Sequence, residues 1–383
     1  MGDRPITYLV TGAAGFIGAN FVHFVADKYG ADEVNLVLLD ALTYAGNLHS
    51  IAGLLERDNV TFIHGDINDS DLVNDIFDRY SPDYVVNFAA ESHVDRSISD
   101  PRTFLVTNVL GTQTLLDAAR RAWTDAEAGR KRFLQVSTDE VYGSLSRDYD
   151  EARTAKHTAA GADGNPVEIA FDTFGDELFT ESTPLAPRSP YSASKAAADM
   201  LVGAYGETYG LPVVITRCSN NYGPYQFPEK LIPLIINNVR EGRPLPVYGD
   251  GRYVRDWLFV TDHVRAIDTV LRRGAPGKVY NIGGLNERQN IDIVKTIIAT
   301  YAELTGTEPR YDLIRFVADR PGHDRRYAID PTRAMSELGW APLTDFDRGI
   351  RETVRWYVDH TDWVDDVTSG QYRDYYNQMY SNR

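Results

Sequence analysis

The sequence predicts an α/β fold built on a doubly wound parallel sheet that has helices on both faces. Short apolar runs recur along the first half of the chain, segments with helical spacing separate them, and a glycine-rich turn follows the first run. Strands that alternate with helices indicate a parallel sheet, because each helix returns the chain to the same end of the sheet. The length of 383 residues is enough for a second, smaller mixed α/β lobe.

The first predicted strand is ITYLVT, Ile6–Thr11, and the turn GAAGFIG follows it at residues 12–18. The next segment, residues 19–30, has helical spacing, and Gly30 is a plausible end for that helix. Glycines let the backbone approach a pyrophosphate, and the helix N-terminus behind them offers N–H groups without a partner in the helix. This order of strand, glycines and helix predicts a Rossmann-type dinucleotide site.

The second predicted strand, VNLVLLD, ends in Asp40. Its distance from the glycines is the one at which an acid meets the ribose of a bound dinucleotide. A carboxylate there accepts hydrogen bonds from the adenosine ribose hydroxyls and would repel a 2′-phosphate. The predicted cofactor is therefore NAD rather than NADP.

Three later strand-like runs end near Asp66 and Ile67, near Ala89 and Ala90, and at Thr138. Helical segments such as DLVNDIFDRY and NVLGTQTLLDAARRA lie between them. Ligands of such sheets bind beyond the carboxyl ends of the strands. We therefore expect these residues to line one crevice.

Directly after the last of these runs, STDEVYG places Asp139 and Glu140 side by side. Successive side chains of an extended strand point to opposite faces, so both acids reach one ligand only if the chain turns just after Thr138. Two carboxyls held close repel each other and hold a single proton more tightly, so the pair can supply one acid and one base. Acids at strand ends are also common in solvated loops, and the motif alone leaves that alternative open.

The strongly helical segment PYSASKAAADMLVGAYGETYG places Tyr191 and Lys195 on one face. A tyrosine is a poor base at neutral pH, and we expect the Lys195 ammonium to lower the pKa of Tyr191. Beside a nicotinamide, the pair can take a proton from a hydroxyl while hydride leaves the same carbon. Tyr and Lys at this spacing also occur by chance on surface helices.

These motifs resemble those of the extended short-chain dehydrogenase/reductases that modify nucleotide sugars. Within that group the chain is most similar to the dTDP-glucose 4,6-dehydratases over nearly its whole length, through DALTYAGN, NFAAESHVDRSI, STDEVYG, SPYSASKAAAD, RCSNNYGPYQFPEKLIP, PVYGDGRYVRDWLFVTDH and DRPGHDRRYAID. The resemblance implies a lyase. Tyr191 takes the C4 hydroxyl proton as hydride passes to NAD, Glu140 removes the C5 proton, and protonated Asp139 donates to the departing C6 hydroxyl. The hydride then returns to C6 and C5 is reprotonated, which regenerates NAD and leaves a 4-keto-6-deoxy sugar nucleotide.

The resemblance also implies three sets of site residues. The catalytic set is Thr138, Asp139, Glu140, Tyr191 and Lys195. The cofactor set is Gly12, Gly15, Phe16, Ile17, Gly18, Asp40, Leu42, Thr43, Asp66, Ile67, Ala89, Ala90, Thr107, Tyr191, Lys195 and Asn221. The substrate set is Ser92, Thr138, Asn220, Lys230, Leu231, Pro246, Val247, Tyr248, Arg255, Asn290, Arg320 and His323.

Some neighbours of these sets have plainer interpretations. His323 could be an ordinary loop histidine beside Asp324, and Arg325 and Arg326 are expected at the surface or in ion pairs rather than as ligands. No metal is assigned to the site, and the single cysteine, Cys218, argues against a metal site built on thiolates.

The sequence divides into two predicted lobes. Residues 1–212 are mainly the NAD-binding domain, and residues 213–383 are mainly a substrate-binding lobe from which some strands and helices return to the first. Residues 144–189 form an acidic insertion, for which a mobile cover or an inter-subunit element is our hypothesis and an inert surface loop the alternative. The C-terminal segment DWVDDVTSGQYRDYYNQMYSNR predicts a final helix packed on the surface.

Composition excludes several partner classes. The formal charge of −16 argues against nucleic acid or an anionic membrane as the main partner. The N-terminus enters a strand without a signal peptide, and no apolar run approaches the length of a membrane span, so a cytoplasmic protein is expected. The resemblance implies a homodimer formed through helices of the first lobe, including the helix of Tyr191.

Other functions remain open at this stage. A UDP-glucose 4,6-dehydratase, or a nucleotide-sugar epimerase or decarboxylase, has the same fold, and one methyl group on a base is worth only ~1–3 kcal/mol of discrimination. A non-catalytic NAD-binding regulator is a more distant alternative.

Overall fold

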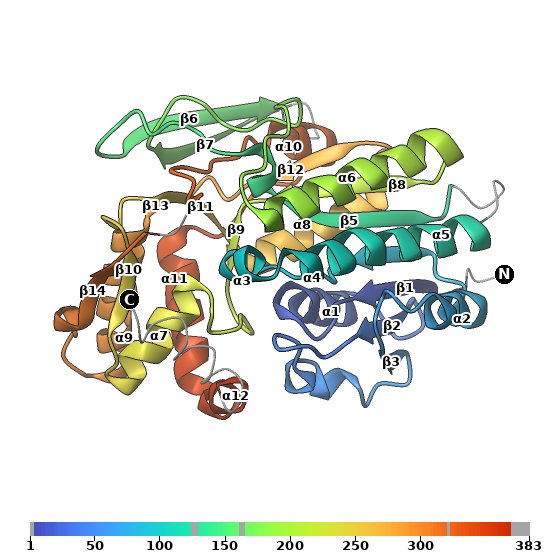
Figure 1. Ribbon diagram of the computed structural model, residues 1–383, viewed down its shortest axis with the longest axis horizontal. Helices are drawn as coiled ribbons and strands as arrows, with labels where there is room; N and C mark the ends of the chain where they lie inside the picture. Colours follow the sequence, from blue (N-terminus) through green and yellow to red (C-terminus); the bar gives the residue numbers. More distant parts are fainter. Residues whose placement is uncertain (1–3, 124–128, 161–164, 320–321, 369–383) are drawn as a thin grey trace.

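The computed structural model describes residues 4–123, 129–160, 165–319 and 322–368, and its centre is a parallel sheet. Within these ranges the sheet has seven strands in the order β12-β8-β5-β4-β1-β2-β3 (Figure 1). Their bounds are β1 Ile6–Thr11, β2 Val34–Asp40, β3 Val60–His64, β4 Tyr84–Asn87, β5 Arg132–Thr138, β8 Val213–Cys218 and β12 Val279–Ile282. All neighbouring pairs are parallel, which confirms the predicted sheet.

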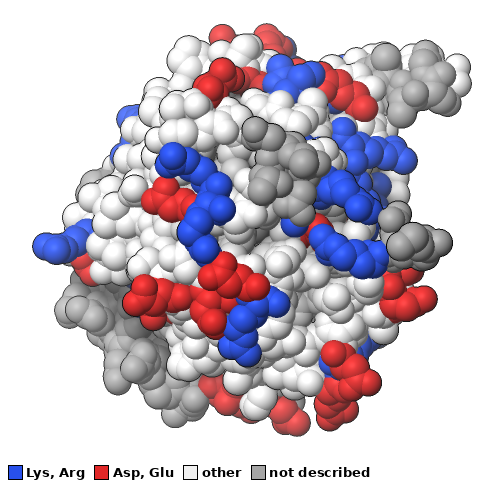
Figure 2. All heavy atoms as spheres, turned by 90° about the vertical axis from the view of Figure 1, so that its right-hand side faces the viewer, with Lys and Arg blue, Asp and Glu red and all other residues white. Residues whose placement is uncertain are grey.

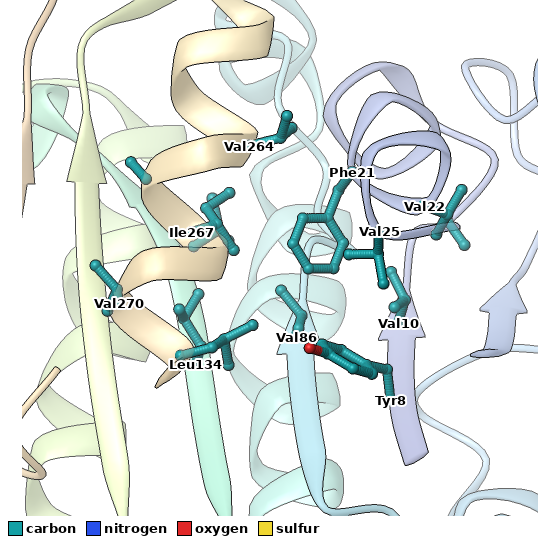
Figure 3. Packing of buried hydrophobic residues seen from close by; sticks show 14 of the residues in the cluster. Tyr8, Val10, Phe21, Val22, Val25, Val86, Leu134, Val264, Ile267 and Val270 are labelled. Atoms are coloured by element: carbon teal, nitrogen blue, oxygen red, sulfur yellow. The ribbon is translucent and has the colours of Figure 1, made fainter. Parts of the chain in front are cut away.

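Helices cover both faces of this sheet. On one face lie α1 Phe16–Lys28, α8 Val260–Arg273 and α10 Thr332–Leu338; on the other lie α2 Ser70–Tyr80, α5 Thr112–Ala122 and α6 Pro190–Tyr209. Figure 3 shows Phe21 of α1 and Ile267 of α8 packed against β1, β4 and β5, where Tyr8, Val86 and Leu134 are fully buried. Apolar burial on both faces holds the strands in register.

The ends of some predicted elements differ from the structure. The sheet pairing of β3 stops at His64 and that of β4 at Asn87, two to three residues before the predicted ends, although apolar residues continue after β4. Helix α1 ends at Lys28, two residues before Gly30, and its C-cap residue Tyr29 is extended. The predicted helix that ends at Ala122 is α5, and three short elements precede it in the structure. They are the helices α3 Val94–Ser99 and α4 Pro101–Leu105 and a π-helical turn, η3 Val106–Gly111.

A second lobe lies beside the carboxyl ends of the strands (Figure 1). It contains a mixed sheet of β9 Asn220–Tyr222, β11 Val254–Phe259 and β13 Glu287–Gln289, and a parallel pair, β10 Leu245–Tyr248 and β14 Ile314–Val317. A separate core is surrounded by the helices α7 Leu231–Glu241, α9 Asn290–Thr305, α11 Phe346–Asp359 and α12 Thr361–Val367.

Short 3₁₀ helices span Leu48–Ser50 and Ala52–Leu54, between β2 and β3, and Tyr311–Leu313, before β14.

The C-terminal helix was predicted on the surface, and its described part is α12. Trp363 is buried there, and its indole N–H donates to Ser50 Oγ at 3.1 Å. The rest of the predicted segment, residues 369–383, lies outside the described residues.

The acidic insertion forms an antiparallel hairpin, β6 Arg153–Ala160 and β7 Pro166–Thr173, that the sequence did not predict. Its base is fixed to the second lobe, because Thr173 Oγ1 donates to Glu287 Oε1 at 2.7 Å. Arg326 Nε donates to Glu287 Oε2 at 2.7 Å, and both of these side chains are almost wholly buried. Arg326 therefore lies in an ion pair, as expected, and joins the hairpin to the body of the protein.

The surface is not uniformly acidic despite the net charge. Figure 2, which views the side that bears α2 and α5, shows basic and acidic side chains next to one another. Among the described residues, none of the helices combines the length and the apolar character that crossing a membrane requires.

Replacing Arg326 with methionine should lower the free energy of unfolding by about 3–5 kcal/mol, because Glu287 is then left as a buried charge without its partner. Urea denaturation of both proteins measures the difference. The neighbouring pair between Arg325 and Asp250 is the matched control, because both side chains are partly exposed and R325M should cost less than ~1 kcal/mol. Equal losses for the two variants would contradict the structural role of Arg326.

Candidate active site

Two adjoining cavities lie beyond the carboxyl ends of the central strands. The larger has a volume of about 320 Å³ and the smaller about 170 Å³. Both are lined by Glu140, Asn220, Asn221, Gln226, Glu229 and Lys230. The site is therefore one crevice that runs from the parallel sheet into the second lobe.

Nearly all residues of the predicted cofactor set line the larger cavity. They are Gly12, Gly15, Phe16, Ile17, Gly18, Asp40, Thr43, Asp66, Ile67, Ala89, Ala90, Thr107, Tyr191, Lys195 and Asn221. Leu42 does not line it: its side chain packs against the core, and its backbone N–H donates to Asp40 Oδ1 at 2.8 Å. Leu42 has a φ of 48°, a conformation that leucine rarely adopts.

The glycine-rich turn forms a cradle in this cavity. A Cβ on Gly18 would lie 2.1 Å from the Gly12 carbonyl oxygen, so the turn closes only with glycine there. A Cβ on Gly15 would meet Gly12 O at 3.3 Å and no other heavy atom within 4 Å, so it would instead take space in the cavity. The first turn of α1 begins at Phe16 and contains no acidic residue, which leaves its N–H groups suited to a pyrophosphate.

Asp40 lies beside the glycine-rich turn. Its carboxylate accepts hydrogen bonds from the backbone N–H groups of Ala14 and Leu42, both at 2.8 Å. Burial raises the pKa of this carboxyl, and the two N–H donors oppose that shift. The cradle and this acceptor fit a dinucleotide with free ribose hydroxyls.

The chain turns directly after Thr138, as the argument about the two acids requires. Asp139–Tyr142 form a 3₁₀ turn, η5, and Thr138 Oγ1 accepts a hydrogen bond from the Glu140 N–H at 3.3 Å at its start. Asp139 and Glu140 consequently line the same cavity as Tyr191. The alternative of two solvated loop acids does not describe this geometry, because Asp139 is only 2% exposed.

Asp139 is an unusual carboxyl. Its Oδ1 accepts a hydrogen bond from Thr138 Oγ1 at 3.2 Å, whereas its buried Oδ2 has no hydrogen-bond partner among the described residues. Burial, and then the charges of Glu140 and Asp256, raise the pKa of Asp139 well above its ordinary value, while Arg255 opposes the shift. The protein therefore favours a protonated Asp139, which is the form that can donate.

Tyr191 and Lys195 face the cavity from the first turns of α6. A capping box between Ser189 and Ser192 starts this helix, and Lys195 Nζ donates to Val136 O at 2.6 Å. The prediction that Lys195 lowers the pKa of Tyr191 is wrong, because the pKa of Tyr191 is raised. Burial, and then Glu140, raise the pKa of Tyr191, while a hydrogen bond with Thr138 opposes them. Burial also lowers the pKa of Lys195.

The predicted substrate set divides between the two cavities. Ser92 and Thr138 line the larger one, and the smaller one is lined by Asn220, Lys230, Leu231, Pro246, Val247, Tyr248, Arg255, Asn290 and His323. The buried Asn220 Oδ1, at the junction, has no hydrogen-bond partner among the described residues. Arg320 lies outside the described residues.

His323 lines the smaller cavity rather than being only an ordinary loop histidine. Its Nδ1 lies 2.7 Å from Asp319 Oδ1, and its ring stacks on Tyr253 with the centroids 3.7 Å apart. Arg325 forms an ion pair with Asp250 at 3.2 Å, as expected.

Sequence reasoning missed several residues of the crevice. Among them are Glu91, Asp95, Glu229 and Trp257, which line one or both cavities. Sequence reasoning also missed His263, which lines neither cavity but lies behind the site, where its buried ring Nδ1 is 2.8 Å from Asn221 Oδ1. No spacing rule points to them, because they lie on segments that meet only in the folded chain.

The hairpin β6–β7 contributes none of its described residues to either cavity. The structure therefore gives no support to a cover over the crevice. An inter-subunit role for this hairpin stays a prediction.

Comparisons with known proteins agree with this arrangement. The model of the NAD dependent epimerase/dehydratase family matches residues 8–283. A dTDP-glucose 4,6-dehydratase of Xanthomonas campestris is 51% identical over 373 residues, which cover 96% of this chain and 97% of that protein. One of Salmonella typhimurium is 49% identical over 379 residues, which cover 98% and 99%.

Solved structures show the same similarity. A dTDP-glucose 4,6-dehydratase of Bacillus anthracis in complex with NAD is 43% identical, has a TM-score of 0.78 and covers 94% of this chain and 99% of its own. One of Streptomyces venezuelae with NAD and TYD bound is 42% identical, has a TM-score of 0.80 and covers 94% and 100%. A UDP-glucose 4-epimerase of Thermus thermophilus in complex with NAD is 27% identical, with a TM-score of 0.75, and covers 93% and 100%.

The raised pKa of Asp139 predicts how D139N changes stability with pH. The folded chain holds this proton more tightly than the unfolded chain, so the stabilising contribution is complete below the ordinary carboxyl pKa. It is lost as pH rises through the raised pKa. The free energy of unfolding of the wild type, minus that of D139N, should therefore fall as pH rises across the window between the ordinary carboxyl pKa and the raised pKa of Asp139.

Urea denaturation of both proteins at a series of pH values measures this difference. Asp148 is the control, because a hydrogen bond from Ser146 lowers its pKa and it stays ionised throughout that window. D148N should show no such trend. A difference between wild type and D139N that does not change with pH would refute the raised pKa.

Proposed function

The chain belongs to the NAD dependent epimerase/dehydratase family, and we propose that it is an NAD-dependent dTDP-glucose 4,6-dehydratase. Such a lyase oxidises C4 of the sugar, eliminates water across C5 and C6, and reduces C6. The observation that supports this most directly is the turn Asp139–Tyr142, which brings two neighbouring acids into the cavity that Tyr191 and Lys195 also line.

The first task of the site is to remove a proton from the C4 hydroxyl. We assign it to Tyr191, which hydrogen-bonds Thr138. Lys195 holds its ammonium against the Val136 carbonyl at the same strand end. When bound, NAD supplies the hydride acceptor for C4 and the hydride donor for C6.

The two acids divide the elimination between them. Oxidation at C4 acidifies the neighbouring C5–H bond, and Glu140 is assigned as the base that takes this proton. Asp139 is assigned as the acid that protonates the departing C6 hydroxyl, so that it leaves as water. What supports this order is the raised pKa of Asp139, because a carboxyl that keeps its proton is a donor.

We place the nucleotide diphosphate in the smaller cavity. Lys230 and Arg255 supply positive charge there, and a guanidinium fork suits phosphate oxygens. Pro246, Val247 and Tyr248 are assigned to the base. The assignment to thymine rather than uracil follows the similarity to the dTDP-glucose 4,6-dehydratases, since a pocket discriminates weakly against one methyl group.

The oligomer, the location and the division into lobes stay predictions. A homodimer through the first lobe is supported by large apolar side chains that are exposed on the surface of one chain, namely Leu105 and Leu110 at 51% and Met200 at 65%. These residues lie on α4, η3 and α6. A cytoplasmic location and the boundary near residue 212 rest on the sequence.

Incubation with dTDP-glucose tests the proposed function. The expected product is a 4-keto-6-deoxy sugar nucleotide, formed without net release of reduced cofactor, and mass spectrometry detects the loss of water. UDP-glucose is the parallel substrate, because a faster reaction with it would identify a UDP-glucose dehydratase. A C4-inverted sugar would identify an epimerase, and no turnover of either substrate would leave a non-catalytic NAD-binding protein.

The variant E140Q separates oxidation from elimination. It should still oxidise C4, so reduced cofactor accumulates in absorbance, but formation of the dehydrated product should slow by about 10²–10⁴-fold because the general base is missing. Single-turnover measurements follow both signals. The exposed Glu151 provides a control, since E151Q should behave as the wild type. Dehydration at the wild-type rate by E140Q would remove Glu140 from the mechanism.

A further inference from the structure

Three segments that are far apart in the sequence meet at one buried carboxylate, Glu229. Tyr44 comes from the loop after β2, Arg96 from α3 and Glu229 from the segment before α7. The Tyr44 hydroxyl donates to Glu229 Oε1 at 3.1 Å. Arg96 Nε lies 3.4 Å from Glu229 Oε2, and its guanidinium lies over the Tyr44 ring at 3.7 Å from the centroid.

Glu229 occupies the junction of the two cavities. It lines both of them, and its side chain is only 2% exposed. A buried carboxylate is costly unless charged or hydrogen-bonding groups compensate it, so its partners are held strongly in place. None of the roles assigned above uses this acid, although it is among the most buried charged groups of the crevice.

The loop of residues 41–47 forms part of the wall of the larger cavity. Ala41, Thr43, Ala45 and Gly46 line that cavity together with the glycine-rich turn. The Gly46 N–H donates to Thr43 O at 3.0 Å, which closes a turn with Tyr44 at its first central position. Leu42, in its left-handed conformation, lies just before this turn.

Tyr44 fastens this loop to the other lobe. Its ring packs against Phe227 with the centroids 5.7 Å apart, and it adjoins the core of the second lobe rather than that of the parallel sheet. At the far end of the loop, the Asn47 N–H donates to Ala14 O at 3.1 Å. The wall of the cofactor cavity is thus held by contacts with both lobes.

We propose that Tyr44, Arg96 and Glu229 form a latch that holds the loop 41–47 across the dinucleotide cavity and limits the rate at which the bound dinucleotide leaves. For the loop 41–47 to move away from the cavity, the hydrogen bond between Tyr44 and Glu229 must break. The Glu229 carboxylate then loses one of its partners. The proposal rests on the proposed function in one respect, namely that the dinucleotide is NAD.

Exchange of bound NAD for isotopically labelled NAD tests the latch in the holoenzyme. Y44F removes one hydroxyl and keeps the ring, and it should exchange its cofactor about tenfold faster than the wild type, the effect of one hydrogen bond to a charged acceptor. E229Q keeps an acceptor for Tyr44 but loses the charge that faces Arg96, and it should also exchange faster. Both rates are measured without any sugar substrate.

The chain contains a matched control for Y44F. Tyr29 donates to Asp268 Oδ2 at 2.8 Å, and the Arg272 guanidinium lies over its ring at 4.1 Å, so a tyrosine, an arginine and a carboxylate also meet where α1 packs on α8. Y29F should therefore exchange NAD at the wild-type rate. Wild-type exchange by both Y44F and E229Q would overturn the latch, and so would a Y29F rate as fast as that of Y44F.

Failure of the latch and failure of the proposed function give different results. The exchange experiment reports on cofactor binding alone, and the dTDP-glucose assay reports on product alone. Fast exchange by Y44F together with no dehydration in the wild type would keep the latch and remove the dehydratase. Normal dehydration with equal exchange rates would do the reverse.

Discussion

The common direction of the central strands is the constraint on which the site depends. Since β1, β2, β4, β5 and β8 are parallel, their carboxyl ends gather at one edge of the sheet. Asp40 and Thr138 are the last residues of β2 and β5, the glycine-rich turn and Ala89 follow β1 and β4, and all line one cavity. An antiparallel strand in any of these positions would deliver its terminal residue to the opposite edge. Residues far apart in the sequence therefore meet at this edge.

Burial at this edge favours one protonation state of each ionisable group there, and for Asp139 that state suits its assigned role as an acid. Apolar cores on both faces of the sheet exclude water from the ends of β5 and β8. The same exclusion raises the pKa of Asp139 and of Tyr191 and lowers that of Lys195. Each shift favours the neutral form, and neutral Asp139 is a proton donor. Asp139 and Glu140 are adjacent in the sequence, so it is the surroundings of each carboxyl that separate their roles.

Sequence reasoning succeeded where a local rule determines the structure. The bounds of β1 and β2 follow from their apolar runs, and the turn after Thr138 follows from the need to bring Asp139 and Glu140 to one ligand. It failed where tertiary pairing decides. Apolar residues continue past β4, but pairing stops at Asn87. In the insertion of residues 144–189, Val167, Ile169 and Phe171 alternate along β7, but its partner β6 has no such alternation, so the sequence does not predict the hairpin. The contacts of Glu229 with Tyr44 and Arg96 could not be predicted, because they form only when three distant segments pack together.

The two lobes do not correspond to two continuous halves of the sequence. The loop 41–47 follows β2 of the parallel sheet, yet Tyr44 adjoins the core of the second lobe. In the other direction, β8, α8 and β12 come late in the chain and complete the first lobe. A reaction that oxidises one carbon and reduces another needs the sugar and the dinucleotide to stay together until hydride returns. Exchange of elements between the lobes serves this need, because each lobe supplies part of the wall around the ligand of the other.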